Sequence, residues 1–141
     1  MSAITTQNAG SIWADRRLRA ALFLWTVLVW GSRLRNIVND GDLEGAELLT
    51  NFGVALFLLV AAIAMVVSLK RDLSWHGRAL GVLVIAGITR FTIRGFSVLA
   101  NPEWDTGFKV VHTVLWVVTV ILSILAAREY SRVRSSAWVS S

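Results

Sequence analysis

The sequence predicts an all-α membrane protein, an antiparallel bundle of four transmembrane helices with both termini on the cytoplasmic side. Of the 141 residues, 55% are hydrophobic and 16% are charged, whereas a soluble domain is typically about 45–50% apolar and about 25% charged. The apolar residues gather in four runs close to the roughly 20 residues that cross a bilayer. Basic and acidic residues then alternate between the segments that separate these runs.

The four predicted helices belong to a single transmembrane domain, 1–141, with short tails, and cover 18–38, 48–69, 79–100 and 110–127. Helix is the expected structure because every backbone group within lipid must be hydrogen-bonded inside its own segment. The apolar stretch within the first run ends at Gly31-Ser32-Arg33 without a small-x-small cleavage pattern, so we expect a retained helix and not a signal peptide.

The second run carries no charge, whereas the third contains two arginines and the fourth is closed by Arg128. Orientation follows from basic residues near the helix ends. Three segments are basic and belong on one side, with Arg16, Arg17, Arg19, then Lys70, Arg71, Arg78, then Arg128, Arg132, Arg134. The two remaining loops are acidic. We therefore expect a bacterial cytoplasmic membrane protein with both termini inside and two acidic outer loops.

Composition excludes several kinds of chemistry. Cysteine is absent, which removes disulfides, thiolate metal ligands and thiol redox chemistry. The formal charge of +5 comes from residues that flank or interrupt apolar runs, so it favours a membrane and not nucleic acid. The two histidines, His76 and His112, lie at opposite ends of the predicted helices and cannot form a close pair of haem ligands. We expect no haem, zinc or other cofactor.

A layer of polar and basic residues is predicted in the outer half of the membrane. From a helical rise of about 1.5 Å per residue, Arg90 lies roughly 18 Å from the inner flank of its helix and Arg94 roughly 24 Å. The same count places the other members at similar or greater height. The layer contains Arg33, Asn36, Asn51, Arg90, Arg94, Lys109 and His112.

Helical spacing places these residues on coherent faces. Arg90 and Arg94 are four residues apart and share one side of the third helix. A polar stripe follows the fourth helix at alternating steps of three and four, as in a coiled-coil seam, through Lys109, His112, Trp116, Thr119 and Ser123.

Two interpretations of the layer remain open. In the first it binds an anionic small molecule or a lipid headgroup, as part of transport, because arginine donates paired hydrogen bonds to phosphate and carboxylate. In the second the basic residues pair with acids of the outer loops, namely Asp40, Asp42, Glu44, Glu47, Glu103 and Asp105.

Two further functions are carried as alternatives. The chain is also compatible with an accessory subunit of a larger membrane complex, or with a homo-oligomer, in which the polar layer is structural. An enzyme acting on lipid headgroups would need acid–base work from His112 with Glu47 or Asp105, and no obvious nucleophile accompanies them.

The remaining features are interpreted simply. His76 follows Trp75 in an inner loop and is expected at the membrane interface. Gly77 and Gly81 form a small-xxx-small pair that permits a close helix contact. Residues 129–141 are expected to form a basic tail on anionic lipid.

Overall fold

The computed structural model describes residues 16–39 and 45–139, and within these ranges the chain forms four α-helices. They are α2 (Arg17–Asn39), α3 (Gly45–Lys70), α4 (His76–Ala100) and α5 (Thr106–Val139). The prediction of an all-α protein is confirmed.

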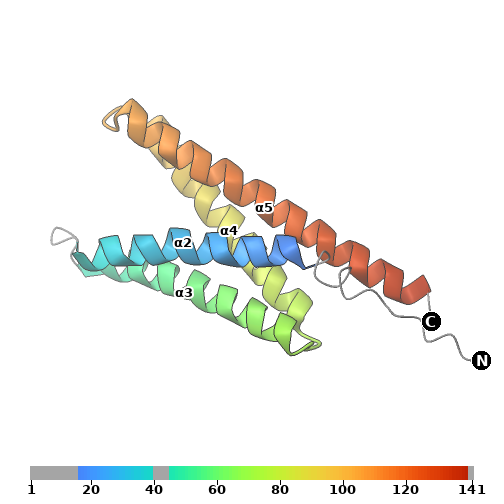
Figure 1. Cartoon of the computed structure of the whole chain (residues 1–141). Helices are drawn as coiled ribbons and strands as arrows, with labels where there is room; N and C mark the ends of the chain where they lie inside the picture. The colour runs from blue at the N-terminus through green and yellow to red at the C-terminus, as the bar shows by residue number, and fades with distance from the viewer. Residues whose placement is uncertain (1–15, 40–44, 140–141) are drawn as a thin grey trace, which may run out of the picture.

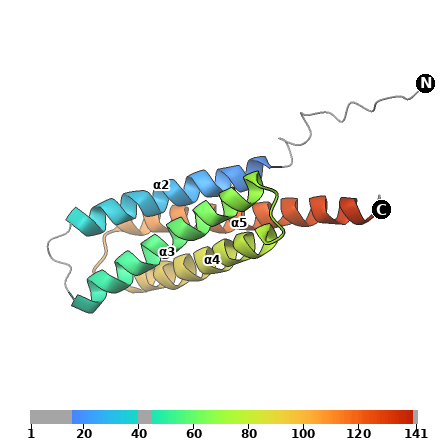
Figure 2. The same ribbon diagram turned by 90° about the horizontal axis from the view of Figure 1, so that it is seen from below.

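Each helix packs against two others. Contacts join α2 to α3, α3 to α4 and α4 to α5, and further contacts between α2 and α5 close the ring. We call the end that holds the start of α2 and the turn between α3 and α4 the proximal end, and the opposite end the distal end (Figure 2). The α2–α3 pair and the α4–α5 pair diverge toward the distal end (Figure 1).

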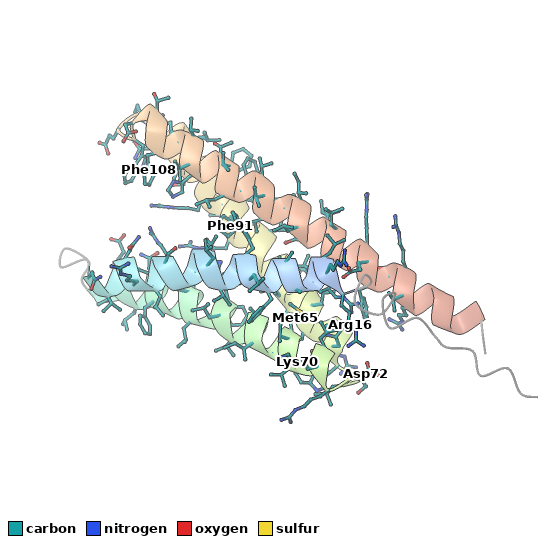
Figure 3. All side chains as sticks on the ribbon, in the orientation of Figure 1. Arg16, Met65, Lys70, Asp72, Phe91 and Phe108 are labelled. Carbon is teal, nitrogen blue, oxygen red and sulfur yellow. The ribbon has the colours of Figure 1, made fainter. Side chains whose placement is uncertain are left out.

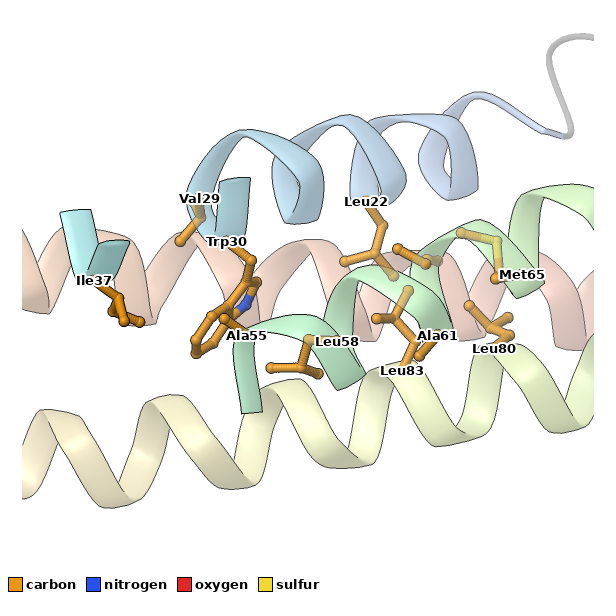
Figure 4. Close-up of a cluster of buried hydrophobic side chains, with 12 residues drawn as sticks. Leu22, Val29, Trp30, Ile37, Ala55, Leu58, Ala61, Met65, Leu80 and Leu83 are labelled. Carbon is orange, nitrogen blue, oxygen red and sulfur yellow. The ribbon is translucent and has the colours of Figure 1, made fainter. Parts of the chain in front are cut away.

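Small and branched residues form the contact face of α3. Ala55, Leu58, Ala62 and Met65 recur every three or four residues along it, and each is at most 1% exposed. They meet leucines of α2 and α4 (Figure 4). Alanine at this face lets the neighbouring backbones approach closely, which is how helices associate in lipid.

The outer surface is strongly apolar. On α3 alone, exposed large hydrophobic side chains include Leu56, Phe57, Val60 and Ile63. A water-soluble monomer rarely exposes an apolar patch of this kind, whereas lipid covers it at no cost. Three helices, α3, α4 and α5, are long and apolar enough to cross a membrane. α2 has the length, with 23 residues, but arginines near both of its ends lower its mean hydropathy.

α5 is longer than the sequence predicted. It has 34 residues, or about 51 Å at the standard rise, and it projects past the other helices at the proximal end (Figure 2). The predicted span ended at residue 127 because Arg128 marks the edge of the apolar run. The helix continues because the next residues contain neither glycine nor proline, and because Glu129 is buried against α2.

Candidate functional site

A cavity of about 280 Å³ lies where the two helix pairs diverge. We call it the distal cavity. Its polar lining consists of three arginines, an asparagine, a histidine and a serine, and no acidic residue of the described chain lines it. These polar residues are Arg33, Asn36 and Ser32 from α2, Arg90 and Arg94 from α4, and His112 from α5.

Arg90 is held in place by the neighbouring helix α3. Its Nη2 donates a hydrogen bond to Oδ1 of Asn51 on α3, at 3.1 Å. Arg94 and Arg33 lie close enough for their positive charges to repel that of Arg90. Like charges on facing helices disfavour closer packing unless an anion lies between them. The distal cavity is therefore a region of concentrated positive charge.

An aromatic ladder fixes the α5 wall of the cavity. Trp104, Phe108 and His112 are spaced by four residues, with ring centroids 4.3 Å and 4.0 Å apart along the series. Nδ1 of His112 lies 3.0 Å from the carbonyl oxygen of Phe108. A carbonyl only accepts, so Nδ1 carries the hydrogen. Nε2 is then the atom that exchanges a proton or meets a ligand. Figure 3 shows Phe108 near the distal end and Phe91 deeper in the opening.

The structure thus brings most of the predicted layer together. Five of its members line the cavity, and Asn51 accepts a hydrogen bond from Arg90. Lys109 is half-buried and does not line the cavity. Trp30, which is 8% exposed, also lines the cavity and meets Phe91 edge-on, with their ring centroids 5.6 Å apart.

The described acids of the outer loops do not pair with the arginines of α4. Within residues 16–39 and 45–134, no ion pair joins Arg90 or Arg94 to Glu47, Glu103 or Asp105. Asp105 instead accepts a hydrogen bond from the backbone of Phe108 at 2.9 Å and caps α5. Asp40, Asp42 and Glu44 lie outside the described residues. Over the described ranges, histidine and acidic side chains nowhere form a cluster able to hold a metal ion.

A buried ion pair that the sequence did not indicate lies at the proximal end. Nε of Arg19 is 3.0 Å from Oε2 of Glu129, and their side chains are only 5% and 8% exposed. The same carboxylate accepts hydrogen bonds from the backbone N–H groups of Leu18 and Arg19, at 3.1 and 3.2 Å. Glu129 therefore neutralises Arg19 and caps the first turn of α2 from another helix.

His76 extends this network. Nη1 of Arg19 lies 3.1 Å from Nε2 of His76, and Nδ1 of His76 lies 3.0 Å from Oγ of Ser68. Arginine only donates, so Nε2 accepts, Nδ1 carries the hydrogen and His76 is neutral. The Ser68 hydroxyl then donates to the carbonyl of Met65 at 2.7 Å. His76 is 8% exposed, because this chain of hydrogen bonds satisfies both ring nitrogens inside the bundle. Its location at the level of the membrane interface stays a prediction.

One sequence signal for this network existed. The polar stripe on α5 continues at the same steps from Ser123 through Ala126 to Tyr130, and Glu129 lies beside it. Glu129 is also the one acidic residue in the basic segment that follows residue 127. The predicted helix stopped before Arg128, so neither feature was assigned to a helix face.

Comparisons with protein-family models, with curated protein sequences and with solved structures find no match to this chain.

Proposed function

We propose that this protein is a small, non-enzymatic membrane protein that crosses the bilayer four times and binds an anion in its distal cavity. The four crossings place both termini in the cytoplasm and the distal cavity in the outer half of the membrane. Three apolar helices and the antiparallel contacts of α2 with α3 and α5 support this arrangement. Basic residues at the proximal end favour a cytoplasmic location for it.

This topology has a simple test. We expect a reporter enzyme that works only in the cytoplasm to be active when it is fused after Ser141. A second reporter that works only outside the cytoplasm, fused at the same position, should be silent. An active external reporter would contradict the proposed orientation, because it would place the C-terminus outside the cytoplasm.

The observation that carries the binding proposal is the charge of the distal cavity. Three arginines share its lining, and the described residues contribute no carboxylate to it. An arginine within a transmembrane segment costs about 2.5–3.5 kcal/mol on insertion scales, and such residues usually serve a functional site. Arg90 and Arg94 form no ion pair with the described acids, so a bound anion is the partner that best offsets this cost.

The ligand chemistry is a phosphate or carboxylate group. Guanidinium forks match both geometrically, and hydrogen bonds between charged groups are about twice as strong as neutral ones. The side-chain amide of Asn36 adds a further donor to the lining of the cavity. The group has two sources, a free anion or a lipid headgroup. Leu28, which is 64% exposed, also lines the cavity and marks an opening toward lipid.

Replacing Arg94 with glutamine is expected to weaken anion binding about tenfold or more, because a hydrogen bond to a charged group contributes about 1.5–3 kcal/mol. The measurement is the rise in thermal stability as inorganic phosphate is added to protein in zwitterionic nanodiscs. A ligand at a hundred times its Kd stabilises by about 2.7 kcal/mol. Arg35→Gln is the matched control, since Arg35 lies on α2 near this end, is exposed and does not line the cavity.

A second arm separates the two sources. The same proteins are released from nanodiscs containing phosphatidylglycerol and examined by native mass spectrometry. A phosphate response without retained lipid identifies a free anion, and lipid lost only in Arg94→Gln identifies a headgroup. If wild type shows neither response, or if Arg94→Gln and Arg35→Gln behave alike, the proposal is wrong.

A further inference from the structure

A second and larger cavity, of about 1000 Å³, lies at the proximal end. We call it the proximal cavity. The start of α2, the turn between α3 and α4, the first turn of α4 and the projecting part of α5 form its walls. Figure 3 labels Arg16 and Asp72 at this end of the molecule. It is separate from the distal cavity, and the two share no lining residue.

The deep wall of this cavity is rigid and electrically neutral. Arg19 and His76 line it, but the charge of Arg19 is balanced by Glu129 and its Nη1 is bonded to His76. Both side chains are buried. The cavity therefore has a fixed, hydrogen-bonded base, and its ligand-binding charge must come from other residues.

Three arginines supply that charge. Arg16, Arg78 and Arg134 line the proximal cavity from three different elements, and Asp72 is the acidic residue among its described lining. Over the described part of the chain, none of these arginines forms an ion pair with Asp72. Arginines converging from separate segments of the chain on a shared cavity favour an anion with several acceptor oxygens.

A hydroxyl group and an apolar edge complete the lining. The hydroxyl of Tyr130 lies against Gly77, where a Cβ would collide with it, and Tyr130 and Ser74 both line the cavity. Leu69, Leu73 and Val133 contribute apolar surface beside these polar groups. A lining that combines basic and apolar residues matches the phosphate and glycerol region of a lipid.

The position of the cavity agrees with this chemistry. It lies at the last turn of α3 and the first turn of α4, where the apolar part of each helix begins or ends. Basic pockets between transmembrane helices at this level bind anionic headgroups. At about 1000 Å³, the cavity is within the range of specific ligand sites, about 300–1,000 Å³.

We propose that the proximal cavity binds the phosphate of an anionic phospholipid from the leaflet on that side, through Arg16, Arg78 and Arg134. Tyr130 donates a further hydrogen bond to the same phosphate. This site is independent of the anion in the distal cavity, since it uses different residues at the opposite end of the bundle.

The test uses the full chain in nanodiscs of phosphatidylcholine with and without phosphatidylglycerol. Native mass spectrometry after gentle release measures how much of each lipid stays bound. The variant Arg78→Gln/Arg134→Gln is expected to retain about tenfold less phosphatidylglycerol than wild type. The matched control is Arg71→Gln/Arg128→Gln, which removes the same charge from exposed positions that do not line the cavity and should retain lipid as wild type does.

Each outcome decides the proposal. Equal retention by the two double variants, whether high or low, contradicts a specific site and indicates general surface attraction or none. A wild type that does not prefer phosphatidylglycerol over phosphatidylcholine also contradicts it. If the arginine variant does not fold, Tyr130→Phe replaces it, and an expected two- to fivefold loss of lipid is the supporting result, while no loss opposes it. Arg94→Gln should leave this lipid bound, which separates the two sites.

Discussion

Replacing Glu129 with glutamine is expected to lower the free energy of unfolding by about 3–5 kcal/mol, the usual cost of removing one partner from a buried ion pair. Arg19 and Glu129 are 5% and 8% exposed and 3.0 Å apart. Without the carboxylate, the buried guanidinium loses the charge of its described partner.

The capping role of the carboxylate adds to this loss. Glu129 accepts hydrogen bonds from the backbone N–H groups of Leu18 and Arg19 at the start of α2. Removing a helix cap costs about 0.5–2 kcal/mol. A glutamine amide has one acceptor oxygen and directs an NH₂ donor at groups that are themselves donors. Both the charge and the cap are therefore weakened by one substitution.

The measurement is unfolding in mixed micelles as sodium dodecyl sulfate is increased, followed by tryptophan fluorescence. Arg128→Gln is the control, because Arg128 is the adjacent residue and is exposed. Arg19→Met/Glu129→Met should recover most of the stability, since apolar pairs often replace buried ion pairs at little cost. A loss in Glu129→Gln no larger than that in Arg128→Gln would show that the ion pair is unimportant.

Gly77→Ala is expected to destabilise the protein by about 1–3 kcal/mol, the typical cost of adding a methyl group to a packed contact. A Cβ at this position would collide with the hydroxyl of Tyr130 and lie 2.7 Å from its Cζ. Tyr130 cannot move easily, because its ring packs edge-on against His76 at 5.6 Å. Displacing Tyr130 would therefore disturb the proximal network.

Gly81→Ala is the control, and it is expected to raise stability where Gly77→Ala lowers it. Gly81 is one turn further along α4, and a Cβ there would have no neighbour within 4 Å. Alanine stabilises a helix interior by about 0.5–1 kcal/mol relative to glycine. Unfolding of the two variants under the same conditions should therefore shift in opposite directions. If both gain stability, the contact between Gly77 and Tyr130 is not tight.

Gly77 and Gly81 differ in their surroundings although they share one face of α4. Their spacing permits a close contact at either residue, and within the described chain a Cβ would meet a neighbour at Gly77 and not at Gly81. Spacing identifies a face of a helix. Which part of that face meets a large side chain depends on the neighbouring helix.

The distal cavity was largely predictable. Helix rise and spacing are fixed by local hydrogen bonding, so counting residues placed Arg90, Arg94 and His112 at similar depth and on defined faces. Five of the seven predicted residues line the cavity. Lys109 does not, because the rotation of α5 about its own axis relative to α4 is set by packing and not by the sequence of α5 alone.

The proximal network was not predictable in the same way. In the sequence, Arg19 is one of three arginines at the start of the first apolar run, and nothing local distinguishes it from Arg16 or Arg17. Its partner Glu129 is 110 residues away and lies on a part of α5 that the sequence assigned to a tail. A long-range pair of this kind is specified only when two helices cross at a particular residue.

The sequence by itself determined the all-helical structure, the lengths of the apolar runs and the faces on which basic residues lie, because these depend on hydrogen bonds and burial within each helix. The tertiary structure alone decided that Arg19 is neutralised while Arg90 and Arg94 converge on a cavity. The reason is physical. Where α2 and α5 cross at the proximal end, the carboxylate of Glu129 reaches Arg19. Where the two helices diverge at the distal end, Arg90 and Arg94 line a cavity.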